Sequence, residues 1–301
     1  MYVITGATGN IGSKAADILL ARGEKVRVVG RSKDRLQRFV DKGAEAAVGD
    51  LKDSAFLAGA FTGATAVFAM IPPDLSARDF RAYQNEIGEI FAAAIVTSGV
   101  RHVVSLSSQG AELPSGTGPI LGLRDQEKRL NDLPGVNILH LRPTYFMENL
   151  LMNIPLINQK GIAGSAVRGD LPFAMIATKD IAAYLSERFV KRDFEGKSVH
   201  DLLGERDLSL GEAASVIGGR IGMPGLKYVQ FPYEETAKWM MEMGVGKDAS
   251  RLFVEMNKAI NDGLLVLRRP RTSANTTPTS IEEFAGTFAS HFAAATPRKA
   301  A

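Results

Sequence analysis

The sequence predicts an α/β fold, a doubly wound parallel sheet with a smaller, mostly helical C-terminal lobe. Over the first 142 residues, short runs rich in β-branched residues alternate with longer segments of helical periodicity. This alternation is typical of a parallel sheet with helices on both faces, and right-handed crossovers leave the doubly wound arrangement. After Pro143 the alternation stops and helical patterns prevail.

The elements of the first part are expected in a regular order. The strands are expected at 2–5, 25–29, 44–48, 66–71, 102–106 and 136–141. The helices between them are expected at 11–22, 34–42, 54–60, 77–98 and 125–132. The first helix shows the reasoning, since apolar residues at 11, 15, 16, 18, 19 and 20 recur at helical spacing.

After Pro143 the sequence pattern predicts mostly helices. They are expected at 178–190, from 209 onward, and at 231–244, 247–261 and 281–292, with one strand at 199–203 and a turn-rich stretch at 161–170. Ser209 with Glu212 three residues later is the pattern of a capping box, and Thr178 and Asp180 can cap the first of these helices. We therefore expect a parallel-sheet domain at 1–142, which a segment at about 178–203 extends. A second lobe is expected at 143–177 and 204–292, and a flexible tail at 293–301.

Composition excludes several classes of protein. Of 301 residues, 45% are hydrophobic and 23% charged, which argues against disorder. The chain has no cysteine, so a disulfide framework, an iron–sulfur cluster and a cysteine nucleophile are excluded. The 36 Lys and Arg are scattered among 33 Asp and Glu, whereas a nucleic-acid partner would need a clustered basic stripe.

The beginning of the sequence suggests a location. MYVITGATG has neither a basic segment nor a long apolar run, so it does not resemble a signal peptide. No run of 18 apolar residues occurs. We expect a cytoplasmic protein with no membrane association.

A glycine-rich loop is the strongest motif. TGATGNIG, residues 5–12, directly follows the first strand and opens the first helix, as a dinucleotide fingerprint requires. Its glycines permit a tight turn, close approach of a pyrophosphate and close packing of helix on strand. The order Gly12-Ser13-Lys14 excludes a P-loop, and the alternative is a glycine turn that serves packing only. The residues assigned to cofactor binding here are Gly6, Thr8, Gly9, Asn10, Ile11 and Gly12.

The end of the second strand indicates which cofactor is preferred. A site for NAD(H) would place an acidic residue there to bind the ribose hydroxyls, but this chain has Gly30, Arg31 and Ser32. Arg31 can pair with a 2′-phosphate through its planar guanidinium, and Ser32 adds a hydroxyl donor. NADP(H) is therefore the preferred cofactor and NAD(H) the alternative. A solvated charged turn would be the non-functional explanation.

Six short motifs along the chain resemble those of a known protein family. TGATGNIG, VRVVGRS, GDLKD, AMIPPD, GVRHVVSLSSQGAE and LRPTYFMEN occur in this order and resemble the NmrA-like branch of the atypical short-chain dehydrogenase/reductases, NAD(P)H:quinone reductase-like members above all. The resemblance covers roughly residues 2–200. It implies a Rossmann fold and a C-terminal lobe that binds substrate.

The resemblance also implies roles for single residues. Asp50 and Leu51 would contact adenine, Met70, Ile71 and Pro72 would lie beside the nicotinamide ribose, Ser107 and Ser108 would lie under the nicotinamide, and Tyr145, Phe146 and Asn149 would line the substrate pocket. Each has a structural alternative. Asp50 could cap the next helix, the two prolines could form a rigid turn, and the aromatic pair could be core.

One family feature is missing. Most short-chain reductases use Tyr-x-x-x-Lys, in which the tyrosine donates the proton. Here that frame holds Arg124 and Lys128, and arginine is a poor acid. Arg124 could instead stabilise a developing negative charge or hold a cofactor phosphate; the alternative is an exposed helical arginine. No histidine pair has metal-ligand spacing and no Gly-x-Ser-x-Gly elbow occurs, so we expect no metal site and no hydrolase.

Two functions fit these observations. The first is an NADPH-dependent reductase that transfers hydride to a quinone or a similar small conjugated electrophile, since water can protonate the reduced quinone and no phenol is needed. The second is an NAD(P)-binding redox sensor of the NmrA type, which would act through a protein partner without turnover. The sequence gives no oligomeric state.

Overall fold

A seven-stranded sheet organises the first of two units. In this computed structural model, which describes residues 1–295, the strand order is β10-β6-β5-β4-β1-β2-β3. The pairs from β3 to β6 are all parallel. The strands are β1 (Tyr2–Ile4), β2 (Val26–Gly30), β3 (Glu45–Val48), β4 (Ala66–Ala69), β5 (His102–Leu106), β6 (Asn137–Pro143) and β10 (Lys197–Leu202). The predicted doubly wound sheet is confirmed.

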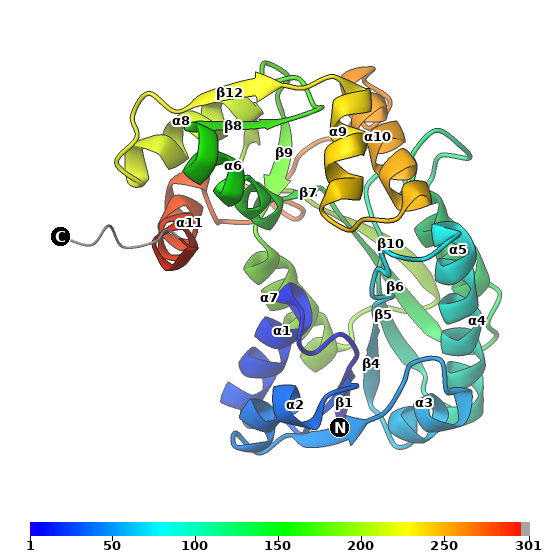
Figure 1. The fold of residues 1–301 in the computed structure, drawn as a ribbon. Helices are drawn as coiled ribbons and strands as arrows, with labels where there is room; N and C mark the ends of the chain where they lie inside the picture. The colour runs from blue at the N-terminus through cyan, green and yellow to red at the C-terminus, as the bar shows by residue number, and fades with distance from the viewer. Residues whose placement is uncertain (296–301) are drawn as a thin grey trace. The chain divides into compact units, whose positions relative to one another are not determined.

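Helices cover both faces of this sheet (Figure 1). On one face lie α1 (Asn10–Ala21), α2 (Lys33–Val40) and α7 (Thr178–Lys191), and on the other α3 (Ser54–Phe61), α4 (Phe80–Ser98) and α5 (Ile120–Asn131). Buried apolar side chains of α3, α4 and α5 pack on β1, β4, β5 and β6. Because the strands from β3 to β6 are parallel, their carboxyl ends lie at the same edge of the sheet. This unit comprises 1–115, 119–142 and 179–201.

The second unit comprises 116–118, 143–178 and 202 onward, and it contains two small sheets. One joins β11 (Asp207–Leu208), β9 (Phe173–Ile176) and β7 (Tyr145–Phe146), and the other joins β12 (Lys227–Gln230) and β8 (Ile162–Ser165). The helices are a 3₁₀ helix η1 (Met147–Asn153), α6 (Ile154–Lys160), α8 (Leu210–Arg220), α9 (Tyr233–Glu242), α10 (Lys247–Asn261) and α11 (Ile281–Ala295).

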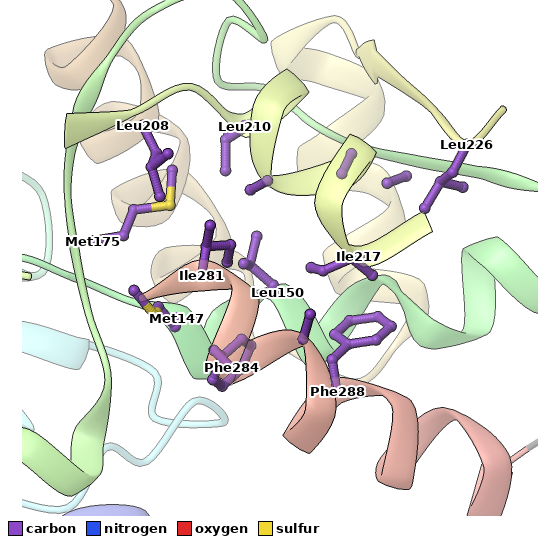
Figure 2. Close-up of a cluster of buried hydrophobic side chains, with 14 of the residues drawn as sticks. Met147, Leu150, Met175, Leu208, Leu210, Ile217, Leu226, Ile281, Phe284 and Phe288 are labelled. Atoms are coloured by element: carbon purple, nitrogen blue, oxygen red, sulfur yellow. The ribbon is translucent and has the colours of Figure 1, made fainter. Parts of the chain in front are cut away.

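An apolar cluster holds the second unit together (Figure 2). Phe284 and Phe288 of α11 pack with Ile217 of α8 and Leu150 of η1, all almost fully buried. Ser209 and Glu212 form the expected capping box at the start of α8. The last helix continues to Ala295, and residues 296–301 of the predicted tail lie outside the described part of the chain.

The main errors of the sequence-based prediction are in element boundaries and short strands. Helix α5 begins at Ile120 rather than 125, and α4 begins at Phe80 rather than 77. The strands β7, β8, β9, β11 and β12 and the helices η1 and α6 were not predicted. Across residues 1–295, no helix is long and apolar enough to cross a bilayer.

Candidate cofactor site

The glycine loop has backbone and packing that only glycine allows. Gly6 has φ +62°, and a Cβ there would lie 1.9 Å from the Met70 methyl carbon. A Cβ on Gly12 would lie 2.4 Å from the Gly6 carbonyl oxygen. The start of α1 is therefore pressed against the end of β1, which is what Gly6 and Gly12 permit.

The N-terminus of α1 is open for an anion. Gly9 is its N-cap and no side chain caps the helix. The Gly9 N–H donates to the Gly6 carbonyl (2.9 Å) and the Ser13 N–H to the Gly9 carbonyl (3.1 Å), which leaves the N–H groups between them for a ligand. Thr8 and Asn10 are exposed beside this opening, while Ile11 is buried and packs inward. A phosphate would fit the unsatisfied N–H groups and the positive end of the helix.

Thr5 fixes the neighbouring strand ends. Its hydroxyl donates to the Phe68 carbonyl (2.7 Å) and accepts from the Met70 N–H (3.1 Å). The end of β1 is thus joined to the end of β4, and the Met70 side chain is held over Gly6. The sequence-based prediction did not include Thr5, although a buried hydroxyl at a strand end usually has such a role.

Basic side chains stand at the end of β2. Arg31 is exposed and makes no hydrogen bond or ion pair with any residue in 1–295, while Ser32 caps α2 by accepting from the Arg35 N–H (3.4 Å). The Arg35 guanidinium reaches the Thr8 carbonyl (3.4 Å), so this second cation lies beside the glycine loop. Hydrogen bonds from Ser76 chiefly lower the pKa of Asp74, and Arg31 contributes to this shift through its charge.

The ends of β3 and β4 are also fixed by local contacts. Asp50 accepts from the Lys52 N–H (3.0 Å), and the cap of α3 is Asp53, which accepts from the Phe56 N–H (3.0 Å). The alternative that Asp50 caps this helix is therefore wrong. Leu51 and Ile71 are half-buried against the core of the unit.

Pro72 is held from the neighbouring helix. Its carbonyl accepts from the Tyr83 hydroxyl of α4 (3.1 Å), and burial raises the pKa of Tyr83. Because the Tyr83 phenol is protonated, it can donate this hydrogen bond to the backbone. The loop after β4 is therefore held by a contact from α4 in addition to the rigidity of its prolines. Met70, Ile71 and Pro72 therefore form one rigid segment next to the glycine loop.

The two serines after β5 differ. Ser107 is 4% exposed and its hydroxyl donates to Glu127 Oε1 of α5 (2.5 Å), whereas Ser108 is half-buried and donates only to the Gln109 carbonyl (3.0 Å). Ser107 thus faces inward as an anchor. Ser108 is the serine of the pair that a ligand can reach.

Glu127 belongs to a buried ionic group. Arg142 of β6 donates to Glu127 from Nε (2.8 Å) and Nη2 (2.6 Å), and to Glu112 from Nη1 (3.1 Å). Burial opposes ionisation of Glu127, but the hydrogen bonds from Arg142 and Ser107 outweigh it and lower the pKa of Glu127. The group was missed because DQEKRL reads as a solvated helix face.

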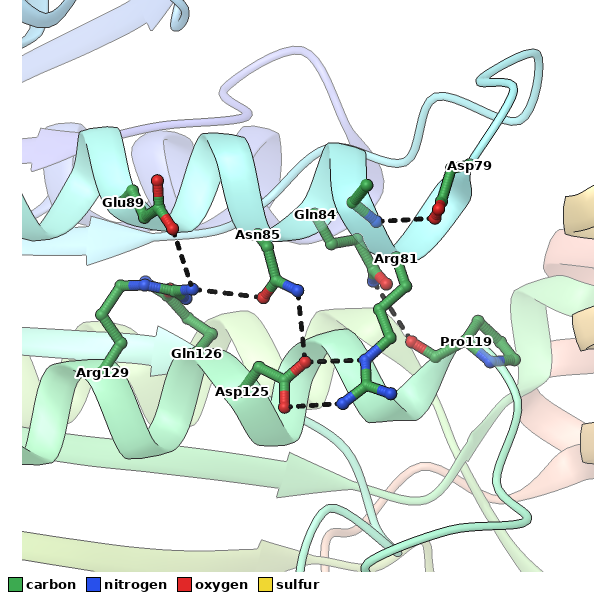
Figure 3. A network of polar contacts seen from close by, with 10 residues as sticks. Asp79, Arg81, Gln84, Asn85, Glu89, Pro119, Asp125, Gln126 and Arg129 are labelled. Carbon is green, nitrogen blue, oxygen red and sulfur yellow. Dashed lines mark hydrogen bonds and ion pairs between the residues drawn. The ribbon is translucent and has the colours of Figure 1, made fainter.

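Arg124 and Lys128, predicted in the positions of the Tyr-x-x-x-Lys pair, both lie on α5. Arg124 is half-buried and makes no hydrogen bond or ion pair within the described chain, and Lys128 is exposed with none either. Their neighbour Asp125 accepts two hydrogen bonds from Arg81 of α4 (2.8 and 3.0 Å) and one from Asn85 (3.3 Å), as Figure 3 shows. The orientation of α5 on α4 is thereby fixed, while both frame residues stay available.

The predicted substrate residues lie on the second unit. Tyr145 packs edge-on against Phe173 (5.4 Å between ring centres), and burial raises the pKa of its hydroxyl. Phe146 is half-buried and Asn149 exposed. The residues predicted to bind the cofactor all lie on the first unit, at or near the ends of β1 to β5.

Taken together, the parallel sheet, the glycine loop and the open start of α1 define a dinucleotide-binding protein of the Rossmann type. The family is given by comparison with known proteins. Residues 2–285 match the NmrA-like family, and the chain belongs to it. The resemblance seen in the sequence is confirmed.

Several relatives carry names that describe an activity. The chain is 27% identical to an NAD(P)H azoreductase of Xenophilus azovorans, over 81% of this chain and 82% of the relative. It is 31% identical to the (4-alkanoyl-5-oxo-2,5-dihydrofuran-3-yl)methyl phosphate reductase of Streptomyces griseus, over 74% and 75%. Among solved structures, an NADPH-dependent quinone oxidoreductase of Escherichia coli in complex with NADPH has a TM-score of 0.80 at 20% identity, covering 95% of this chain and 99% of that one. This last likeness shows a shared fold.

Proposed function

We propose that the protein is an NADPH-dependent reductase that transfers hydride to a quinone or a similar small conjugated electrophile. The observation that carries the proposal is the set of anion-binding groups at one edge of the sheet. The uncapped start of α1 adjoins Arg35, and Arg31 stands nearby with no hydrogen bond or ion pair within residues 1–295. The relatives named as an NAD(P)H azoreductase and a (4-alkanoyl-5-oxo-2,5-dihydrofuran-3-yl)methyl phosphate reductase support reduction as the reaction class.

The residues present fit NADPH. The N–H groups after Gly9 would bind the pyrophosphate, and Arg31 with the Ser32 hydroxyl would bind the 2′-phosphate. Ser32 Oγ accepts from Arg35, so its own O–H is left to donate to a phosphate oxygen. Asp50 and Leu51 would lie at the adenine, and the segment Met70–Pro72 together with Ser108 at the nicotinamide end.

The chemistry requires little from the side chains. Bound NADPH supplies a hydride. Reduction of a quinone leaves an electron-rich oxygen that water can protonate, so the missing phenol of the Tyr-x-x-x-Lys frame is no obstacle. Arg124 would stabilise the developing negative charge, because it is half-buried and makes no hydrogen bond or ion pair within residues 1–295. Lys128, which is exposed, would contribute through cofactor affinity.

The absent phenol also suits the alternative function, a sensor that binds NADP(H) without turnover and signals to a protein partner. Purified protein with NADPH should oxidise the cofactor when quinones of graded potential are added. Bound NADPH that no quinone, azo dye or enone oxidises would favour the sensor. An Arg31→Ala variant is the matched control, since it should lower turnover at limiting NADPH while leaving NADH-supported turnover unchanged.

A further inference from the structure

The buried ionic group behind β5 has no role in the function proposed above. Glu127 and Ser107 are 6% and 4% exposed, and Arg142 holds the carboxylate with two hydrogen bonds. Burying an ionised carboxylate is costly unless it is paired and hydrogen-bonded, so a site that keeps one has a reason for it. Apolar residues of similar volume in place of the ion pair would give comparable stability without the cost of removing two charges from water.

The position of the group indicates that reason. Glu127 Oε1 accepts from Ser107 Oγ (2.5 Å), and the Ser107 N–H donates to the Leu141 carbonyl (2.8 Å). Both the hydroxyl and the backbone of Ser107 are thus fixed where β5 ends. The next residue, Ser108, is the more exposed serine of the pair. Glu127 precedes Lys128, so the support comes from the same helical turn in which other reductases place their proton-donating pair.

We propose that Glu127, held by Arg142, is a positioning residue for the nicotinamide half of the cofactor site. It acts through Ser107, which fixes the backbone that presents Ser108 and Gln109. The inference rests on the proposed NADPH function. It assigns Ser107 an anchoring role rather than direct contact with the cofactor.

Two probes separate this role from general stability. NADPH occupies both halves of the site, whereas 2′,5′-ADP carries the 2′-phosphate but no nicotinamide. Glu127→Gln keeps the volume but turns an amide N–H toward donors of Arg142 or Ser107. The variant should bind NADPH about tenfold more weakly, the scale of one lost hydrogen bond to a charged group. Its affinity for 2′,5′-ADP should be unchanged.

Controls and a double variant complete the test. Ser107→Ala keeps the Glu127–Arg142 pair and should weaken NADPH binding as much as Glu127→Gln does. The double variant should bind NADPH as tightly as Ser107→Ala, because both changes remove the same interaction. Glu112→Gln removes the more exposed partner of Arg142 and should leave both affinities unchanged.

Three results would overturn the inference. If Glu127→Gln weakens the binding of NADPH and of 2′,5′-ADP equally, the role of Glu127 is purely structural. If Ser107→Ala binds NADPH as the wild type does, Ser107 does not anchor the site, and this result holds even if Glu127→Gln fails to fold. If the losses of NADPH affinity add up in the double variant, Glu127 does not act through Ser107. Wild-type protein that binds neither probe would instead contradict the proposed function on which the inference rests.

Discussion

Under the proposed function, the choice of cofactor would depend on Arg31. It is exposed at the end of β2, where an NAD(H) site would carry an acid, and it makes no hydrogen bond or ion pair with any residue in 1–295. Arg31→Ala should reduce the preference for NADPH over NADH by roughly 10- to 150-fold, the equivalent of ~1.5–3 kcal/mol for a charge-assisted hydrogen bond. Calorimetric titration of both cofactors measures this.

The control lies on the following helix. Arg38 is also exposed but pairs with Asp17 (2.7 Å) and stacks on Phe39, so Arg38→Ala should leave the preference unchanged. Equal affinities of the wild-type protein for NADPH and NADH would show that the 2′-phosphate is not recognised.

His140 gives a prediction about stability. It is fully buried in β6, its Nε2 contacts Asn131 (3.0 Å), and its Nδ1 has no partner in the described structure. Burial lowers the pKa of His140 from 6.5 to about 4. Between these values the unfolded chain binds the proton and the folded chain does not, so stability is lost as the pH falls. The loss approaches ~3 kcal/mol once the pH is below both values.

Denaturant unfolding between about pH 7 and pH 4.5 tests this linkage. His140→Leu should flatten part of the curve, while a change at His291, which is exposed on α11, should not. A wild-type curve as flat as that of His140→Leu would mean that His140 is protonated in the folded protein.

At the scale of elements, α5 carries Arg124 and Lys128, the two residues that the sequence predicts in place of the Tyr-x-x-x-Lys pair of short-chain reductases. Arg124→Ala should lower turnover with a quinone by at most ~10²–10³-fold, the scale for loss of one charge-stabilising donor, because no acid is removed. Steady-state kinetics at saturating NADPH measures this. Asp125→Asn is the matched comparison, since it loosens α5 from Arg81 and should lower stability more than the turnover of folded protein. Complete loss of activity in a folded, NADPH-binding Arg124→Ala protein would mean that Arg124 has an obligatory role.

Elements with strong periodicity were predictable, and the supports of the site were not. The first helix and the glycine loop could be placed because glycine spacing and apolar periodicity are local signals. The role of Glu127 was not predictable because its partners lie outside its own helix, Ser107 just after β5 and Arg142 in β6, and a charged helical residue is usually solvated. Strands such as β7 and β11 have two residues each, too few for alternation to show. Helix α5 was predicted too short, since its first turn follows Pro119 without a polar capping residue.

At the scale of the whole molecule, the residues predicted to bind cofactor and those predicted to bind substrate lie in different units. The first unit carries the anion-binding loop, the basic residues and the buried ionic group, and the second carries Tyr145, Phe146 and Asn149. Active sites on such folds are defined by side chains rather than by topology. Under the proposed function, the hydride donor would bind the first unit, and the second unit would select the electron acceptor.

The proposed function depends on hydride transfer from NADPH in the absence of a tyrosine acid. The most direct measurement is turnover of a quinone with NADPH deuterated at the transferred position, across about pH 6 to 9. We expect a primary isotope effect and no acid limb from a phenol. A sharp acid limb with no isotope effect, or bound NADPH that no acceptor oxidises, would contradict it.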